Sequence, residues 1–535
     1  MTTPDPVPWW KEAVIYQVYP RSFADTSGNG IGDLAGIRAH LPDLDWLGVD
    51  ALWISPFFPS PMVDAGYDVS DYCDVDPLFG SLEEFDRLVA EAHALGLRII
   101  IDWVPNHTSD QHPWFVDARS DRKADHRNWY VWRDPDGEGP PNNWVASFDL
   151  TQPAWTFDEA TGQWYLHLFD PSQPDLNWDE PEVVAAMHDT LRFWLDRGVD
   201  GIRADVIHCI GKDPALPDDP PDVAGIPHSA LNDVPITHQR IRHIRSLVDG
   251  YPGDRFVVGE VYLLTTEAVA TYYGDDDELH LSFNFPPLFA QWRAPDWRRC
   301  IDDTVAALAR KDSWPTWVLS NHDNPRHRQR FDLAAGYHGE DASTAARRSE
   351  ARARAAAVLL LTLRGTPFLY QGEELGLLDA VIPPGAGVDP GGRDGCRAPI
   401  PWDGSPDRGW PTPPGVAPWL PFPPEPGRNY RSQRQDETSV LHLYRRLLEL
   451  RRQSAALTSG DFTMLEVHDG VLAYHRTAGS DRVTVAVNFT GGPVEVGTSL
   501  GGGGDRRVAL SSDREGEGAV FTGSLGPDQA VILVD

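Results

Sequence analysis

The stretch LRIIIDWVPNH, from Leu97 to His107, joins a short apolar run rich in isoleucine to a polar cluster. An apolar run of this length is typical of a strand buried in a parallel sheet. In barrels built from such strands, the side chains at the carboxyl ends of the strands form the active site. The stretch therefore predicts a buried strand that delivers Asp102, Asn106 and His107 to one end of a barrel.

Seven further runs have the same character, and amphipathic stretches such as 81–96 and 182–198 separate them. Strands that alternate with helices favour a parallel sheet, and eight of them favour a (β/α)₈ barrel. Polar residues also follow several of these runs, at Arg203 to Asp205, at Glu260 and at Asn321 to Asp323. The runs cover residues 13–19, 51–56, 200–207, 255–262, 279–285, 316–323 and 366–372.

Two segments interrupt the alternation. Trp, Pro, Asp and Asn are frequent after the third strand, and Pro and Gly are frequent over 373–430, which we expect to form long loops over the barrel mouth. A helix over 439–452 precedes short alternating segments typical of antiparallel strands. The fold class is therefore α/β, a TIM barrel formed by 1–104 and 176–455. We expect a loop-rich subdomain over 105–175 and a C-terminal antiparallel β domain over 456–535.

Composition excludes several classes of protein. The 535 residues carry a formal net charge of −34, which repels phosphate backbones and anionic lipid, so no nucleic acid or membrane partner is expected. No apolar run reaches about 18 residues, and no signal peptide is visible. The 4 cysteines lie far apart, which favours reduced thiols and a cytoplasmic location. Monomer and homodimer both stay open.

Three carboxylates, Asp205, Glu260 and Asp323, stand at predicted strand ends. Retaining hydrolysis of a glycosidic bond needs a nucleophilic carboxylate and a proton donor about 5–5.5 Å apart. Arg203 lies two residues before Asp205 and so points to the same side of its strand, where it can hold that carboxylate ionised. Each carboxylate alone could equally cap a helix or form a structural ion pair. Their joint placement favours catalysis.

Four motifs carry a family resemblance: DWVPNH (102–107), GIRADVIH (201–208), VGEVY (258–262) and LSNHD (319–323). They resemble the four conserved regions of the α-amylase superfamily, glycoside hydrolase family 13. QPDLN (173–177) is similar to the fifth region of oligo-1,6-glucosidases and α-glucosidases. The segments AVIYQVYPRSFADTSGNGIGDL, GYDVSDY and RDGCRAPIPW (393–402) extend the resemblance over essentially the whole chain.

The resemblance implies a role for each residue. Asp205 matches the nucleophile, Glu260 the general acid/base, and Asp323 the third carboxylate that stabilises the transition state. The residues that match the glucose-binding pocket are Asp64, Tyr67, His107, Phe169, Gln173, Arg203 and His322. The family also places a sugar-binding arginine near 425–435, where Arg428 and Arg431 both qualify. His208 stands where many relatives carry Asn.

The expected substrate is a short oligosaccharide, because Asp64, Tyr67 and the proline-rich loops suggest a pocket that admits only a chain end. We expect a retaining exo-α-glucosidase that also transfers glucose to sugar hydroxyls. Val206 follows the nucleophile as in relatives with α-1,6 activity, so an oligo-1,6-glucosidase is a close alternative. Trehalose synthase and sucrose isomerase share the barrel and the three carboxylates. Catalytically inactive transporter subunits have lost triad carboxylates, which this chain keeps.

DTSGNGIGD (25–33) places oxygen-bearing side chains at alternating positions, as calcium loops do. An EF-hand calcium sensor would need Glu where this chain has Gly36. The equivalent loop of family relatives binds one calcium or magnesium ion. The resemblance therefore implies one structural Ca2+ or Mg2+ held by Asp25, Ser27, Asn29, Asp33 and the Ile31 carbonyl. A glycine-rich turn without metal is the alternative, since one carboxylate is missing relative to relatives. No organic cofactor is expected.

Overall fold

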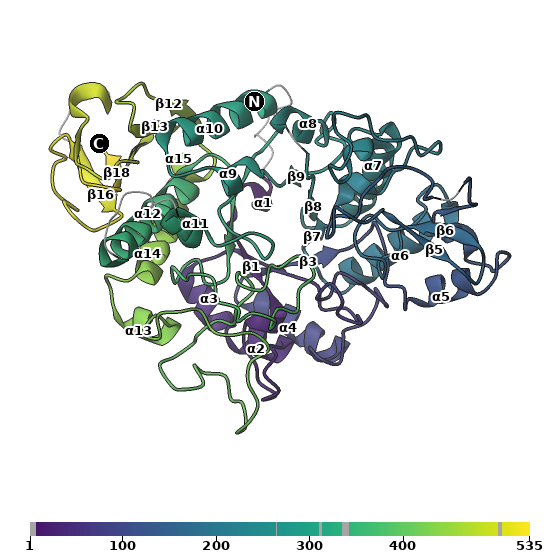
Figure 1. Ribbon diagram of the computed structural model, residues 1–535. Helices are drawn as coiled ribbons and strands as arrows, with labels where there is room; N and C mark the ends of the chain where they lie inside the picture. The colour runs from purple at the N-terminus through teal and green to yellow at the C-terminus, as the bar shows by residue number, and fades with distance from the viewer. Residues whose placement is uncertain (1–6, 138, 264, 310–312, 334–341, 501–505) are drawn as a thin grey trace.

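The computed structural model describes residues 7–137, 139–263, 265–309, 313–333, 342–500 and 506–535. Its largest sheet has 8 strands, all paired in parallel, and every strand that the sequence predicts for the barrel belongs to it (Figure 1). The barrel fold is thereby confirmed. The strands are β1 (Ile15–Val18), β2 (Ala51–Ile54), β3 (Arg98–Trp103), β7 (Gly201–Ala204), β8 (Phe256–Gly259), β9 (Leu281–Ser282), β10 (Thr316–Val318) and β11 (Thr366–Tyr370).

The sheet closes through a side chain at one seam. Its order is β10-β11-β1-β2-β3-β7-β8-β9, so β9 and β10 are the two edges. The hydroxyl of Thr316 in β10 donates to the carbonyl of Ser282 in β9 at 2.8 Å, and the same oxygen accepts from the Asn284 amide at 3.1 Å. Thr316 thus satisfies edge groups that a backbone ladder would otherwise pair.

Helices surround the strands in Figure 1. Helix α4 illustrates why: the Ser81 hydroxyl caps it by accepting from the Glu84 amide, and its buried residues Phe85, Leu88, Val89 and Ala92 recur on one face. The helices are α1 (Trp9–Glu12), α2 (Leu34–Ala39), α3 (Leu41–Leu47), α4 (Leu82–Ala94), α6 (Pro181–Asp196), α7 (Pro235–Asp249), α8 (Thr266–Thr271), α9 (Pro286–Phe289), α10 (Ala294–Ala309), α11 (His327–Leu333), α12 (Ala342–Thr362), α13 (Tyr430–Gln435), α14 (Val440–Gln453) and α15 (Ala455–Thr458).

The segment between β3 and α6 forms a small subdomain with its own core. It contains helix α5 (Pro113–Ser120) and an antiparallel sheet of the order β4-β6-β5. Its strands are β4 (Trp132–Arg133), β5 (Trp155–Asp158) and β6 (Gln163–Leu166). Trp144, Trp155 and Leu168 in this subdomain pack in one cluster with Val206 and Cys209, which follow β7. The subdomain core therefore continues directly into the end of a barrel strand.

The C-terminal region forms an antiparallel sheet of the order β12-β13-β14-β18-β16, beside the pair β15 and β17. It lies at the yellow end of the ribbon, on the side of the barrel away from β4 to β6 (Figure 1). Arg348 and Arg352 of α12 both form ion pairs with Asp528, which tie the sheet to the barrel. The strands are β12 (Asp461–Met464), β13 (Val471–Ala478), β14 (Asp481–Asn488), β15 (Val494–Glu495), β16 (Arg507–Ser511), β17 (Ser524–Leu525) and β18 (Ala530–Val534).

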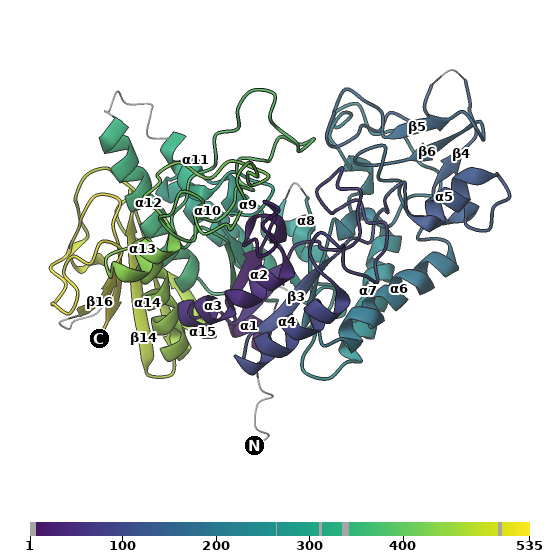
Figure 2. The ribbon, with the colours of Figure 1, turned by 90° about the horizontal axis from the view of Figure 1, so that it is seen from below.

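The stretch between β11 and α13 contains turns and bends with neither helix nor strand, as its proline and glycine content predicts. Figure 2 shows these green loops and the blue subdomain rising on the same side of the barrel. That side carries the carboxyl ends of the strands, so both segments are placed to enclose a site there. Among the described residues, no helix combines the length and the apolar character needed to cross a membrane.

Candidate active site

A cavity of about 130 Å³ lies at the carboxyl ends of the barrel strands. Most of the predicted site residues line it, although they come from six different connections along the chain. Because parallel strands end at the same side of a barrel, residues far apart in sequence meet there. The predicted residues that line the cavity are Asp64, Tyr67, His107, Phe169, Asp205, Glu260, His322 and Asp323.

Arg203 in β7 holds three carboxylates together. Its Nη1 donates to Oδ1 of Asp205 at 2.5 Å and to Oδ1 of Asp102 at 2.6 Å, and its Nη2 donates to Oε2 of Glu260 at 2.6 Å. Burial raises the pKa of Asp205 well above its ordinary value; Arg203 opposes this shift and the charge of Glu260 adds to it. The three carboxylates are therefore held within hydrogen-bond reach of one guanidinium, which fixes their positions relative to one another.

The turn after Asp205 is strained. Val206 adopts a left-handed conformation with φ of 34°, which a β-branched residue rarely does. In this conformation the Val206 amide donates to Oε2 of Glu260 at 3.2 Å. Such strain costs about 1–3 kcal/mol and tends to occur at functional sites. The turn therefore orients the side chain of Glu260 relative to Asp205.

A chain of hydrogen bonds sets the tautomer of His322. The Gln17 amide nitrogen lies 2.8 Å from Nδ1 of His322, and because an NH2 group can only donate, Nδ1 is the acceptor. Nε2 therefore carries the proton and faces the Tyr67 hydroxyl at 2.7 Å and Oδ2 of Asp323 at 3.2 Å. Burial lowers the pKa of His322 to about 3, so the ring is a neutral donor near pH 7. The Tyr67 hydroxyl in turn donates a hydrogen bond to Oδ2 of Asp102 at 3.3 Å.

Arg393 connects opposite walls of the cavity. Its Nη2 donates to Oδ1 of Asp64 at 2.6 Å, and its Nη1 donates to Oδ1 of Asp323 at 2.9 Å. Burial raises the pKa of Asp64 to about 6, against the effect of Arg393. Burial acts in the same direction on Asp323, but its contacts with His322, Arg393 and Arg397 outweigh burial and lower its pKa well below the ordinary range. Asp323 is therefore ionised throughout the neutral range.

His107, Gln173 and Phe169 form a further wall. The Gln173 amide nitrogen donates to Oδ2 of Asp64 at 3.0 Å and lies 3.2 Å from Nε2 of His107. The Phe169 ring packs against the His107 ring at a centroid distance of 5.1 Å. Burial lowers the pKa of His107 to about 4, so this ring is also neutral near pH 7. Gln173 and Arg203 do not line the cavity themselves, but each forms hydrogen bonds to carboxylates that do.

Neither arginine expected near 425–435 lies at the cavity. Arg428 forms ion pairs with Glu425 and Glu350, and Arg431 has 70% of its side chain exposed beside Asp403. The arginine of the cavity is Arg393, in the proline- and glycine-rich loop. The expectation that Arg428 or Arg431 reaches the pocket is therefore not met, and the position at the cavity is taken by Arg393. The signal was present, because Arg393 opens the segment RDGCRAPIPW that extends the resemblance.

The sequence also left three aromatic residues unassigned. Phe148, Tyr262 and Phe285 line the cavity together with Asn321 and Asn324. The rings of Tyr262 and Phe285 meet edge to face at a centroid distance of 5.0 Å, and Tyr262 is half exposed. An exposed aromatic ring at a cavity, here Tyr262 supported by the buried Phe285, is a platform for an apolar ligand face. Sequence reasoning assigns aromatic residues to the core by default, so nothing distinguished these residues beforehand.

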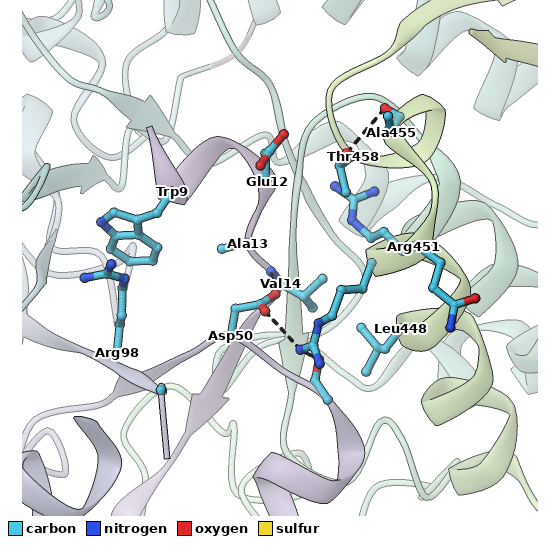
Figure 3. A pocket seen from close by; sticks show the side chains of 14 residues that line it. Trp9, Glu12, Ala13, Val14, Asp50, Arg98, Leu448, Arg451, Ala455 and Thr458 are labelled. Carbon is cyan, nitrogen blue, oxygen red and sulfur yellow. Dashed lines mark hydrogen bonds and ion pairs between the residues drawn. The ribbon is translucent and has the colours of Figure 1, made fainter. Parts of the chain in front are cut away.

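A second, larger cavity has a volume of about 550 Å³, and Figure 3 shows its lining from close by. Trp9, Arg98 and Leu448 contribute to its lining. Its carboxylate at Asp50 is already engaged, since it accepts from the Val14 amide at 2.8 Å and from Arg452 at 3.1 Å. The cavity lies at the amino ends of the strands, where residues stabilise the barrel and do not catalyse.

Many of the carboxylate oxygens in the loop over 25–33 already accept hydrogen bonds from the loop itself. Asp33 caps helix α2 through Gly36 and also accepts from the amide and hydroxyl of Thr26, which uses its acceptor capacity. Asp25 accepts from the amides of Gly28 and Gly30, both at 2.8 Å. Asp25 also accepts from the Ser27 hydroxyl at 3.1 Å, so one of its about four lone-pair positions stays open to a hard cation. The oxygens of Ser27 and Asn29 each keep a further lone pair, although Asn29 accepts from the Ile31 amide. The oxygen ligands of Asp25, Ser27 and Asn29 therefore suit a hard cation, whereas the carboxylate of Asp33 caps helix α2.

Comparison with known proteins agrees with this geometry. Residues 17–460 match the alpha amylase catalytic domain. A probable alpha-glucosidase of Rhizobium meliloti (strain 1021) is 42% identical over 517 residues, which cover 90% of this chain and 89% of that protein. An oligo-1,6-glucosidase of Parageobacillus thermoglucosidasius is 35% identical over 528 residues, 90% of each chain.

Solved structures agree as well. The trehalulose synthase MutB of Pseudomonas mesoacidophila MX-45 is 34% identical, with a TM-score of 0.88 over 99% of each chain. The alpha-glucosyl transfer enzyme XgtA is 38% identical, with a TM-score of 0.87 over 99% of each chain. The barrel, its carboxylate site and these relatives define a glycoside hydrolase. Within that class, the chain belongs to the α-amylase family, glycoside hydrolase family 13.

Proposed function

We propose that this protein is a retaining exo-α-glucosidase that releases glucose from the non-reducing end of short α-glucosides. It also transfers glucose to sugar hydroxyls. The observation that carries the proposal is the pair of bonds by which Arg393 joins Asp64 to Asp323 across the cavity, at 2.6 and 2.9 Å. An endo-acting enzyme needs a cleft open at both ends, whereas this bridge supports a pocket that admits one terminal sugar.

In the proposed reaction, the carboxylate of Asp205 attacks the anomeric carbon of glucose. The glycosidic bond breaks, and its oxygen leaves with the proton of Glu260. Glu260 then takes a proton from water, whose oxygen attacks the anomeric carbon and releases glucose and free Asp205. A sugar hydroxyl in place of water gives transglucosylation. The bonds of Arg203 to both carboxylates support this assignment, because the retaining route needs a nucleophile and a proton donor side by side.

The remaining residues are proposed to bind the sugar. Asp323 stays ionised and accepts from sugar hydroxyls, and its charge stabilises the oxocarbenium-like transition state. His107 and His322 are neutral and donate or accept without adding charge to the site. Tyr67 and Phe169 supply apolar ring faces for the sugar.

A second candidate is isomerisation of sucrose or maltose. The favouring observation is the edge-to-face pair of Tyr262 and Phe285 on the cavity wall. An aromatic pair at the mouth could retain the leaving sugar until it attacks the glucosyl intermediate through another hydroxyl. The structural relatives that are trehalulose synthases are consistent with this candidate.

Product analysis separates the candidates. The purified protein is incubated separately with maltose, isomaltose, sucrose and trehalose, and the products are identified by NMR. Free glucose from maltose and isomaltose, formed first as the α anomer, supports the proposed activity. Conversion of sucrose or maltose into an isomer supports the second candidate. Release of β-glucose, or no release of glucose from maltose or isomaltose, contradicts the proposal.

The loop over 25–33 is proposed to bind one structural Ca2+ or Mg2+ through Asp25, Ser27, Asn29 and the Ile31 carbonyl, while Asp33, also expected as a ligand, holds the loop through Thr26 and Gly36. The free acceptor capacity of these oxygens supports the proposal. The ion takes no part in the reaction proposed for the active site.

The domain limits are likewise proposed: the barrel over 1–104 and 176–455, the subdomain over 105–175 and the C-terminal domain over 456–535. A cytoplasmic location is proposed from the four free cysteines at positions 73, 209, 300 and 396. A small oligosaccharide is the proposed substrate.

A further inference from the structure

Behind the Phe169 wall lies a cluster of metal-binding side chains that the proposed reaction does not use. His208, Cys209 and His228 each place one donor atom within 4.8 Å of the other two. His208 and Cys209 are fully buried. The Phe169 ring separates the cluster from the cavity and packs against His228 at a centroid distance of 4.9 Å. The cluster thus lies next to the active site but outside it.

Two separate turns bring these residues together. His208 and Cys209 lie in the short 3-10 helix Ile207–Cys209, directly after the strained Val206. His228 lies in the long loop before α7 and adopts a left-handed conformation with φ of 65°. A histidine in this conformation is uncommon, and the conformation turns its ring toward His208, with centroids 5.7 Å apart.

The hydrogen bonds place a lone pair on one ring nitrogen of each histidine, and the lone pair of His208 becomes available when the Cys209 thiol loses its proton. The Ser147 hydroxyl donates to the Leu168 carbonyl at 3.1 Å, so its oxygen accepts from Nε2 of His228 at 2.8 Å. Nε2 of His228 therefore carries the proton, and Nδ1 has a lone pair. Sγ of Cys209 lies 3.3 Å from Nε2 of His208, where the thiol is the donor and Nε2 the acceptor.

We propose that His208, Cys209 and His228 form a binding site for one Zn2+ ion or a cation of similar softness. Two imidazole nitrogens and one thiolate form a ligand set that binds Zn2+ in preference to Ca2+ and Mg2+, because those two cations favour oxygen ligands. Zn–S and Zn–N bonds of about 2.3 and 2.0–2.1 Å in a tetrahedron place sulfur and nitrogen about 3.5 Å apart. The 3.3 Å between Sγ of Cys209 and Nε2 of His208 is close to that separation.

Binding exchanges one proton for the ion. The S–H bond of Cys209 breaks, its proton leaves to buffer, and the sulfur electron pair forms the metal bond. The buried cation Lys212 follows Cys209 by three residues. The ammonium of Lys212 is itself paired with Asp175 at 2.8 Å, which limits its repulsion of the ion. The site does not depend on the glucosidase activity.

The ion would join three parts of the chain. His208 and Cys209 belong to the turn after Asp205, His228 belongs to the loop before α7, and Ser147, which holds His228, belongs to the inserted subdomain. Occupation therefore fixes the subdomain and the loop to the end of β7. Because the ion binds only the folded arrangement, it also raises the melting temperature.

The test titrates the purified full-length protein with Co2+, a coloured substitute for Zn2+. One equivalent is expected to give a sulfur-to-cobalt charge-transfer band and the visible bands of a tetrahedral ion, and Zn2+ is expected to abolish both. Cys209→Ser should lose the charge-transfer band, and His228→Asn should weaken binding at least about tenfold, or about 1.4 kcal/mol. Cys300→Ser is the matched control, since this half-buried thiol lies elsewhere and should keep the band.

Circular dichroism establishes that each variant is folded. The proposal is overturned if the folded wild-type protein gives no charge-transfer band. It is equally overturned if the band persists in Cys209→Ser, or if Cys300→Ser removes it, because the thiolate ligand would then be a different cysteine.

Discussion

Nη2 of Arg393 lies 2.6 Å from Oδ1 of Asp64, although 329 positions separate the two residues in the chain. The ion pair joins the loop after β2 to the long loop after β11 across the mouth of the barrel. Asp323 accepts from the same guanidinium, so one side chain sets the position of two proposed sugar-binding carboxylates. The shape of the pocket therefore depends on a residue in a segment without secondary structure.

Replacement of Arg393 tests this dependence. Arg393→Ala removes the charged hydrogen bonds to Asp64, Asp323 and Asp389, each worth about 1.5–3 kcal/mol, and should lower kcat/KM on maltose about 10- to 100-fold. Arg431→Ala is the control, because that side chain is 70% exposed and pairs only at the surface with Asp403. Steady-state kinetics on both variants check the prediction. Equal effects of the two substitutions would contradict the role given to Arg393.

Substrate binding should weaken in acid through Asp64. Burial raises the pKa of Asp64 to about 6, so the carboxylate is ionised above that pH and protonated below it. A protonated Asp64 loses its ion pair with Arg393 and its charge toward sugar hydroxyls. KM for maltose should therefore be constant above about pH 6 and rise as pH falls below it, by up to about tenfold per unit. Asp64→Asn should remove this dependence. A wild-type KM that stays flat down to pH 4.5 would show that Asp64 plays no such part.

The general acid can be identified by comparing substrates whose leaving groups differ in their need for a proton. Glu260→Gln cannot donate a proton, so cleavage of maltose should fall at least about 100-fold. Nitrophenyl α-glucoside, whose leaving group needs little protonation, should retain more of its rate in the first step. Glu267→Gln on α8 is a suitable control, because it changes an exposed residue seven positions away. Equal losses on both substrates would argue against Glu260 as the acid.

Removal of metal tests the loop over 25–33. EDTA should lower the melting temperature by several degrees, since a ligand at 100 times its Kd stabilises a protein by about 2.7 kcal/mol. Ca2+ or Mg2+ should restore it, and Asp25→Asn, combined with Cys209→Ser so that the proposed Zn2+ site cannot respond, should be insensitive to both treatments. An unchanged melting temperature in the wild-type protein rules out the ion. A shift that persists in Asp25→Asn belongs to another site.

The sequence predicted the barrel well because its strands are short apolar runs that end in polar clusters. All eight strands are present, although the run over 279–285 yields only Leu281–Ser282 in β9. The physical reason is that Pro286 begins α9 soon afterwards, and that Thr316 completes the seam with a side chain instead of a ladder. The length of a strand at such a seam depends on tertiary contacts, and these cannot be predicted from the local sequence pattern.

The carboxylates of the site were predictable because each follows a strand. Arg393 was harder to predict, because it lies in a loop with no periodicity and reaches Asp323 across 70 residues. Tyr262 and Phe285 carry no local sign that their rings face a cavity. The His208, Cys209 and His228 cluster depends on the path of a loop, so its members could not be grouped from the sequence.

The central claim is that Asp205 is the nucleophile of a retaining reaction, and covalent trapping tests it most directly. The protein is treated with 5-fluoro-α-glucosyl fluoride, whose glucosyl intermediate hydrolyses slowly, and is then digested and analysed by mass spectrometry. The account predicts one fluoroglucosyl group per chain, attached at Asp205, and no labelling of a folded Asp205→Asn variant. Labelling of another carboxylate, or full turnover by Asp205→Asn, would contradict it.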